Sequence, residues 1–124
     1  MITALQLEIM QKTLETIENV FQSISQEVAT TYRDGPDGWT TLEVLCHLRD
    51  YDAIYRQHAE MMATQENPTL SGSNHETMAI ERAYNQQELR QVLAEFKTSR
   101  QESLAVYREL TPDDWERVCS QMRR

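Results

Sequence analysis

The sequence predicts an all-α protein, and three observations lead to that prediction. Only 3 Gly and 3 Pro occur among 124 residues, too few for the many tight turns of an all-β fold. The charged fraction of 26% suits the exposed faces of long helices. Apolar residues recur at threes and fours over long stretches, the spacing that forms one stripe along a helix. We therefore expect a single helical-bundle domain over residues 1–124, large enough to hold a core without disulfides.

The first expected helix covers residues 3–31. Its apolar stripe consists of Leu5, Ile9, Ile17, Val20, Phe21, Ile24 and Val28. Residues 33–38 contain two Gly, one Pro and two Asp, so they are expected to form a loop. Thr40 followed by Glu43 has the spacing of a capping box, which predicts that a second helix starts there and runs to about residue 63.

The second half of the chain contains further start signals. Residues 64–74 are polar and long for a link between antiparallel neighbours, so we expect them to cross over the bundle. A short helical turn is expected over residues 76–84. Asn85 with Glu88 has cap spacing and predicts a third long helix that runs to about residue 110.

A last start signal lies near the C-terminal end. Thr111 is followed by Pro112 and two acidic residues, a pattern typical of the first turn of a helix. A short helix carrying Trp115 and Val118 is expected there. Three long amphipathic helices are thus present, whereas a bundle usually closes with a fourth. We expect the domain to be incomplete at its C-terminal end.

Composition also limits the partners and the compartment. Twelve Lys and Arg against 20 Asp and Glu give a formal net charge of −8, which argues against a nucleic-acid partner. No apolar run approaches the roughly 20 residues that cross a bilayer, and the N-terminus lacks a signal-peptide pattern. We expect a cytoplasmic protein without membrane association. Cys46 and Cys119 lie outside any metal-binding spacing and are expected to be free thiols in packing positions.

The second expected helix carries the most informative residues. On a helical projection His47 falls within an apolar arc and is expected to face the bundle interior. That arc consists of Val44, Leu48, Tyr51, Ile54, Tyr55, Met61 and Met62, while Arg49, Arg56 and Glu60 are expected on the opposite, solvated side. Asp50 and Tyr51 follow His47 by three and four residues, within reach to supply an oxygen ligand or a supporting hydrogen bond.

Each histidine also has a purely structural interpretation. An inward histidine on an apolar face is more often a core residue than a metal ligand. His58 lies eleven residues after His47, roughly 16 Å along the helix axis, too far for both to bind one ion through bonds of about 2 Å. His75 falls in the polar crossover and is expected at the surface or in a supporting position.

The segment from Gly38 to Asp52, GWTTLEVLCHLRDYD, resembles the second-helix signature of the DinB-like superfamily. In that signature a Trp, a Ser or Thr cap and an inward His-Leu occupy these places. The order of elements and the segment LTPDDW at residues 110–115 are also similar to the family. The resemblance implies an up-down-down-up four-helix bundle, with the fourth helix missing here or supplied by another chain. It also implies a homodimer, because many members are dimers.

The resemblance further implies a divalent metal such as zinc or nickel. Members hold it with three histidines, one on the second helix and two in an HxxxH pair on the last helix. His47 corresponds to the first ligand, with Asp50 and Tyr51 as candidate supporting residues. No HxxxH pair follows Trp115, and neither His58 nor His75 corresponds to a missing ligand. We therefore expect no high-affinity catalytic metal in the chain as given.

Two hypotheses on function follow. Characterised relatives include transferases and isomerases that use low-molecular-weight thiols, so the intact protein is expected to be a metal-dependent enzyme of thiol S-transferase or hydrolase type. The alternative is a non-catalytic helical module, dimeric through an uncovered apolar groove, in which His47 is a core residue or a remnant.

Overall fold

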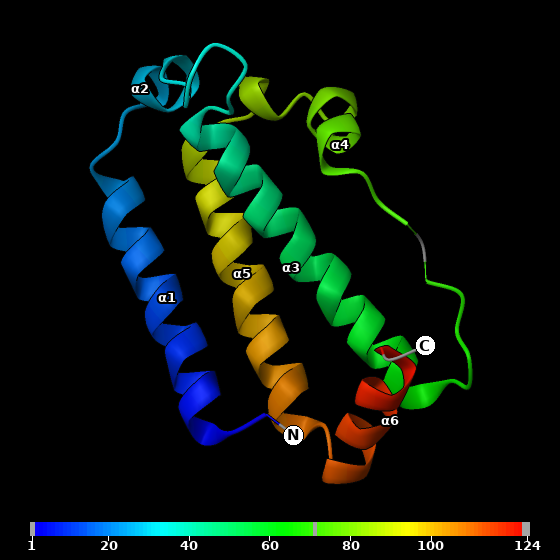
Figure 1. The fold of residues 1–124 in the computed structure, drawn as a ribbon. Coiled ribbons are helices and arrows are strands. Elements are labelled where there is room, and N and C mark those ends of the chain that lie inside the picture. The colour runs from blue at the N-terminus through cyan, green and yellow to red at the C-terminus, as the bar shows by residue number, and fades with distance from the viewer. Residues whose placement is uncertain (1, 71, 123–124) are drawn as a thin grey trace.

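Three long helices run the length of the molecule and shorter ones lie at its two ends in the computed structural model, which describes residues 2–70 and 72–122 (Figure 1). In chain order the elements are α1 (Ala4–Gln22), α2 (Gln26–Thr31), α3 (Thr41–Thr64), α4 (His75–Glu81), the 3₁₀ turn η1 (Tyr84–Gln86), α5 (Leu89–Glu109) and α6 (Pro112–Met122). The predicted all-α fold is confirmed. Within the described residues, none of these helices combines the length and the apolar character needed to cross a membrane.

The helices follow the up-down-down-up course that the resemblance implies. In Figure 1, α1 rises, α3 and α5 both descend, and α6 turns back upward. The segment between α3 and α4 returns along the outside of the bundle, so the expected crossover is confirmed. α1 and α3 pack mainly on α5, and α3 with α5 forms the most extensive contact between helices.

α6 takes the position of the fourth helix, with 11 residues against 21 in α5. The predicted start is confirmed, because the Thr111 hydroxyl accepts a hydrogen bond from the Asp114 N–H and the Asp114 carboxylate accepts one from the Thr111 N–H. Val118 is buried in a small core with Met62 and Ala63 of α3. α6 therefore covers the C-terminal end of α3.

The prediction of one helix over residues 3–31 is wrong, because the structure divides it into α1 and α2. Ser25 is the N-cap of α2, and its hydroxyl accepts a hydrogen bond from the Val28 N–H. The apolar spacing continues across this break because Ile24, between the two helices, still packs against the core. A stripe shows which residues face the core, but it does not show that the backbone between them is helical.

The predicted cap at Asn85 is also wrong. Glu88 is the N-cap of α5, and its own carboxylate accepts hydrogen bonds from the Arg90 and Gln91 N–H groups. Asn85 lies in η1, where its amide donates to the Thr30 carbonyl and accepts from the Thr40 hydroxyl at 2.6 Å. This side chain joins three segments at one end of the bundle instead of starting a helix.

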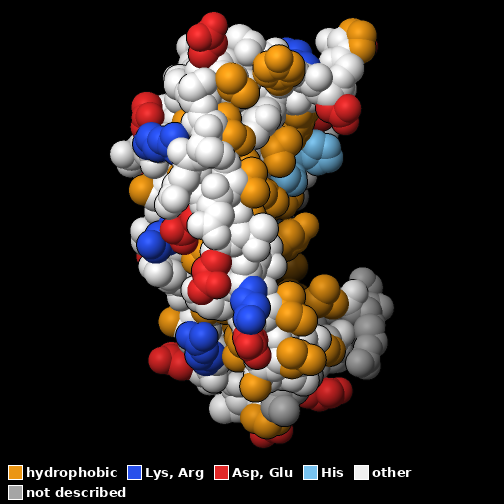
Figure 2. Space-filling model, turned by 90° about the vertical axis from the view of Figure 1, so that its left-hand side faces the viewer, with side chains coloured by type: hydrophobic (Ala, Val, Ile, Leu, Met, Phe, Trp, Pro, Cys, Tyr) orange, Lys and Arg blue, Asp and Glu red, His pale blue; other side chains and the backbone are white. Residues whose placement is uncertain are grey.

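The apolar arc expected to be inward on α3 is only partly buried. Val44 is 41% exposed and Tyr55 61% exposed, whereas Leu42 and Leu45 are fully buried. The fully buried side chains face α5, so the interior of this bundle lies about a third of a turn away from the predicted arc. Figure 2 shows the consequence, since hydrophobic side chains and histidines line the right-hand edge of the molecule above a hollow.

Candidate functional site

His47 lies in the second turn of α3, and the start of that helix is held firmly. The Thr40 hydroxyl accepts a hydrogen bond from the Glu43 N–H, and the Glu43 carboxylate accepts one from the Thr40 N–H, which confirms the predicted capping box. Arg33 forms an ion pair with Glu43 at 2.9 Å. These contacts fix where α3 begins and therefore the direction in which His47 points.

Four rings gather around this position, and we call Trp39, His47, Tyr51 and His75 the histidine cluster. The centre of the His47 ring lies 5.3 Å from that of Trp39, 4.4 Å from that of Tyr51 and 5.7 Å from that of His75. Trp39 also meets His75, with 5.8 Å between ring centres. The cluster thus brings two imidazoles together from segments 28 residues apart.

The loop before α3 places Trp39 in the cluster. A Cβ at Gly38 would overlap the carbonyl oxygen of Asp34, so glycine is needed at this close approach. Arg33 donates a hydrogen bond to the Gly38 carbonyl at 3.1 Å, which closes the loop beneath the tryptophan. The loop predicted from its Gly, Pro and Asp content is confirmed, and it positions one wall of the cluster.

One ring nitrogen of His47, Nδ1, is buried and has no hydrogen-bond partner among the described residues. Burial lowers the pKa of His47 below its ordinary value, the charge of His75 lowers it further, and Asp50 acts in the opposite direction. The imidazole is therefore neutral at pH 7 and keeps a lone pair, the form that binds a metal ion.

His75 reaches the cluster through the crossover. Asn74 is the N-cap of α4, with its side chain accepting a hydrogen bond from the Thr77 N–H, and Met78 of α4 is buried in the main core. The Ser73 hydroxyl donates to the Tyr51 hydroxyl at 3.0 Å, which ties the crossover to α3. His75 is exposed, as the sequence predicted, yet it lies against His47, which the sequence did not reveal.

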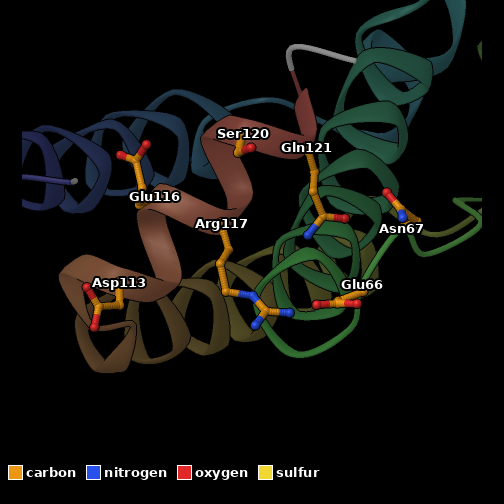
Figure 3. A pocket seen from close by; sticks show the side chains of 7 residues that line it. All are labelled: Glu66, Asn67, Asp113, Glu116, Arg117, Ser120 and Gln121. Carbon is orange, nitrogen blue, oxygen red and sulfur yellow. The ribbon is translucent and has the colours of Figure 1, made fainter.

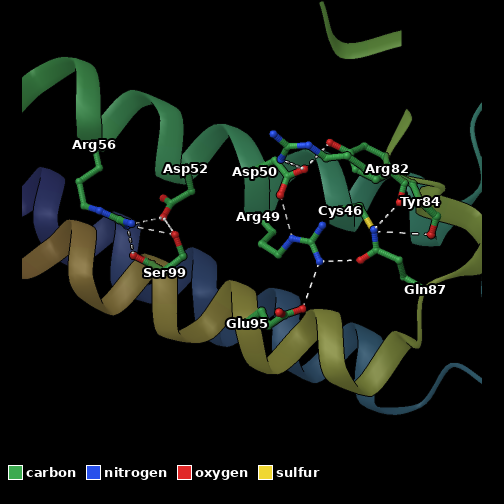
Figure 4. Close-up of polar contacts among 10 residues, drawn as sticks. All are labelled: Cys46, Arg49, Asp50, Asp52, Arg56, Arg82, Tyr84, Gln87, Glu95 and Ser99. Atoms are coloured by element: carbon green, nitrogen blue, oxygen red, sulfur yellow. Dashed lines mark hydrogen bonds and ion pairs between the residues drawn. The ribbon is translucent and has the colours of Figure 1, made fainter. Parts of the chain in front are cut away.

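Of the two residues expected to support His47, only Tyr51 lies in the cluster. Asp50 points instead to a network of charged side chains (Figure 4). Its carboxylate accepts hydrogen bonds from Arg49 and Arg82 at 2.9 Å each and from the buried hydroxyl of Tyr84. All of its strong partners are therefore away from the imidazole, and Asp50 acts on His47 only through its charge.

The expectation that Arg49 and Arg56 are solvated is wrong, because their side chains are only 14% and 13% exposed. Arg49 bonds to Asp50 and, on α5, to Glu95. Arg56 donates to the carbonyl and the hydroxyl of Ser99, also on α5. Both guanidinium groups lie at the α3–α5 contact, where the carboxylates of their partners offset the cost of burying them. Glu60 is exposed as predicted.

A second hollow of the surface lies elsewhere, between α6 and the end of α3 (Figure 3). It has a volume of about 580 Å³ and is lined by Glu66, Asn67, Asp113, Glu116, Arg117, Ser120 and Gln121. Gln121 donates hydrogen bonds to the Met62 and Gln65 carbonyls and so attaches α6 to α3. None of these lining residues is among the described residues that have a buried side-chain polar atom without a partner.

The fold and the cluster define a small helical-bundle protein with two imidazoles at one end of its second long helix. In a comparison with models of known protein families, the model of the DinB superfamily matches residues 9–122. The chain therefore belongs to the DinB superfamily. No curated protein and no solved structure matches the chain.

The residues of this chain fit only in part the three-histidine metal site that the resemblance to DinB-like proteins implies. His47 offers a buried nitrogen with no hydrogen-bond partner, as a ligand would. Among residues 2–70 and 72–122, however, no group of three or more His, Cys, Asp or Glu side chains is arranged to hold an ion. His58 also has a buried, unpartnered nitrogen, but it lies in none of the ring contacts of the cluster. The three-histidine arrangement is therefore not assembled within the described residues.

We predict that Asp50 makes stability depend on pH in the acid range. Burial acts to raise the pKa of Asp50, but the hydrogen bonds from Tyr84 and Arg49 and the charges of Arg49 and Arg82 outweigh it and hold the pKa below its ordinary value. A carboxyl group with a depressed pKa stabilises the fold above the pKa of the unfolded chain, about 4, and this stabilisation is lost as pH falls through the folded value.

Asp50→Asn should lower the free energy of unfolding at pH 7 by about 1–3 kcal/mol, and it should flatten the decline in stability below about pH 4. Urea unfolding at a series of pH values measures both effects. Asp37→Asn, in the exposed loop before α3, is the matched control and should keep the pH profile of the unaltered protein. An unchanged acid slope in Asp50→Asn would contradict the assignment.

A second prediction separates the two free cysteines. Cys46 is fully buried, and burial raises the pKa of its thiol to about 11. Cys119 is partly exposed beside the apolar residues of α1. Because the thiolate is the reactive form, iodoacetamide at about pH 8 should alkylate Cys119 in the folded protein and Cys46 only after urea is added. Mass spectrometry of the peptides checks this, and rapid labelling of Cys46 in the folded state would refute it.

Proposed function

We propose that this protein binds a divalent metal ion through His47, and that it is a metal-dependent enzyme of thiol S-transferase or hydrolase type. The supporting observation is the buried Nδ1 of His47, which has no hydrogen-bond partner in the described part of the chain. A buried polar atom without a partner costs about 1–3 kcal/mol, so such atoms are uncommon unless a ligand or water satisfies them.

The surroundings of His47 suit this role. Trp39 and Tyr51 hold the imidazole from two sides, and Ser73 fixes Tyr51 through its hydroxyl. A ligand that is held in one orientation loses little freedom when it binds an ion. When bound, a divalent ion lowers the pKa of an attached thiol or water and supplies a nucleophile near neutral pH. The class of reaction comes from the resemblance to the family, and the low-molecular-weight thiol is its expected co-substrate.

Metal binding is the direct test of this proposal. Isothermal titration of the apo protein with Zn²⁺ or Ni²⁺ should show weak binding of about one ion per chain, because the described residues assemble no three-ligand set, and His47→Gln should abolish this binding. Gln keeps a polar side chain of similar reach, so folding is preserved and can be confirmed by circular dichroism. His58→Gln, on the same helix, is the matched control and should bind as the unaltered protein does. Equal affinity in His47→Gln would contradict the ligand role.

The non-catalytic, self-associating module is the second candidate function. It is supported by the partly exposed arc of α3 and by an apolar groove of about 500 Å³ between α1 and α6. The groove is lined by Ile2, Gln6, Ile9, Met10, Trp115 and Cys119. Ile9 is 54% exposed, and apolar area of this kind favours contact with a second copy of the chain.

If the exposed arc of α3 forms part of a homodimer contact, sedimentation equilibrium should show association that strengthens with protein concentration. Tyr55→Lys places a charge on the exposed arc of α3 and should shift the equilibrium toward monomer. Tyr32→Lys changes another exposed tyrosine, at the end of α2, and is the matched control. A compact monomer at every concentration would rule out this candidate.

A further inference from the structure

His75 is the residue of the histidine cluster to which neither the sequence nor the family assigns a function. It begins α4 and is exposed, while its ring centre lies 5.7 Å from that of His47 with an angle of 76° between the ring planes. Such a pair has two interpretations. It is an edge-to-face contact between aromatic rings, or it is a pair of ligands waiting for one ion.

The distance between the rings agrees with a shared ion. Two imidazoles bound to one zinc ion through Zn–N bonds of about 2.0–2.1 Å have ring centres roughly 5 Å apart. The observed 5.7 Å is close to this value. His75 is exposed, so its side chain is the one of the pair that can adjust when an ion binds. His58, in contrast, lies about three turns further along α3 and has no access to the same point.

The position of His75 is fixed by contacts on both sides of it. Before it, Ser73 is hydrogen bonded to Tyr51 of the cluster and Asn74 caps α4. After it, Met78 and Ala79 are buried. The ring of Trp39 contacts both imidazoles and limits their movement. These features separate His75 from a surface histidine whose direction is set only by solvent.

We propose that His75 is a second imidazole ligand of the metal ion bound by His47. This inference rests on the proposed function and adds a ligand from the crossover, a part of the chain outside both helices that carry the ligands in the resemblance. A site of two imidazoles with its other positions open to water prefers Ni²⁺, Cu²⁺ or Zn²⁺ over Mg²⁺ and Ca²⁺, which take oxygen ligands. The exposed side of His75 gives the ion a path of entry from solvent.

The test compares three variants of the full chain in titrations with Ni²⁺ and Zn²⁺. His75→Ala should weaken binding about tenfold or more, because one of two ligands is lost. Its thermal unfolding midpoint without metal should stay unchanged, since the side chain is exposed. His47→Gln should abolish binding, and His58→Gln should leave it unchanged. A rise of the midpoint on adding metal, smaller in His75→Ala than in the unaltered protein, is the second measurement.

The outcomes distinguish this inference from the proposed function. If His75→Ala binds Ni²⁺ and Zn²⁺ as tightly as the unaltered protein while His47→Gln does not, His75 is only a packing residue and the inference is overturned. If the unaltered protein binds neither ion, both the inference and the proposed function are overturned. A tenfold or larger loss in His75→Ala, with the metal-free midpoint unchanged, supports the ligand role.

Discussion

The parallel packing of α3 and α5 is the constraint on which the rest of the structure depends. Because both helices descend, the chain must return along the bundle between them (Figure 1). His47 lies 17 residues before the end of α3 at Thr64, about 26 Å along the axis. The ten residues 65–74 span at most about 33–36 Å when extended. The crossover is therefore long enough for α4 to begin near the level of His47.

This course of the chain allows His75 to meet His47. A crossover of this length lets the first residue of α4 reach the level of His47 on α3. The hydrogen bond between Ser73 and Tyr51 then selects the face of α3 on which α4 docks. The cluster is thus a product of topology and of a single polar contact, and the same features hold Tyr84 beneath Asp50 at the other side of the helix.

Ion pairs hold α3 and α5 in register. Asp52 accepts hydrogen bonds from Ser99, Ser103 and Arg100, all on α5, and Arg56 pairs with it from the next turn of α3. Breaking one partner of such a buried set generally costs about 3–5 kcal/mol, because a charge is left uncompensated. A slip of one helix turn along α5 would separate all of these groups at once. The network therefore favours one alignment of two helices whose apolar stripes alone would allow several.

The sequence predicted most of the helix bounds and the course of the chain, because capping boxes and breakers act over a few residues. Thr40 with Glu43 and Thr111 with Asp114 are such local signals, and both are observed. The predictions from the sequence were wrong where a side chain contacts residues from a distant segment of the chain. Arg49 and Arg56 were expected to be solvated because no local pattern in the sequence identifies the groups on α5 that accept their hydrogen bonds. His75 read as surface because its neighbour lies across the crossover.

The histidine cluster contains one of the buried polar atoms that lack a hydrogen-bond partner in the described part of the chain. The buried carboxylates of α3, Asp50 and Asp52, are paired, but the Nδ1 of His47 and the Nε2 of His58 are not. An unpaired buried atom lowers stability by about 1–3 kcal/mol. A ligand at a hundred times its dissociation constant returns about 2.7 kcal/mol, a similar amount. A buried group that lacks a partner in the free protein and gains one from a ligand couples folding to ligand binding.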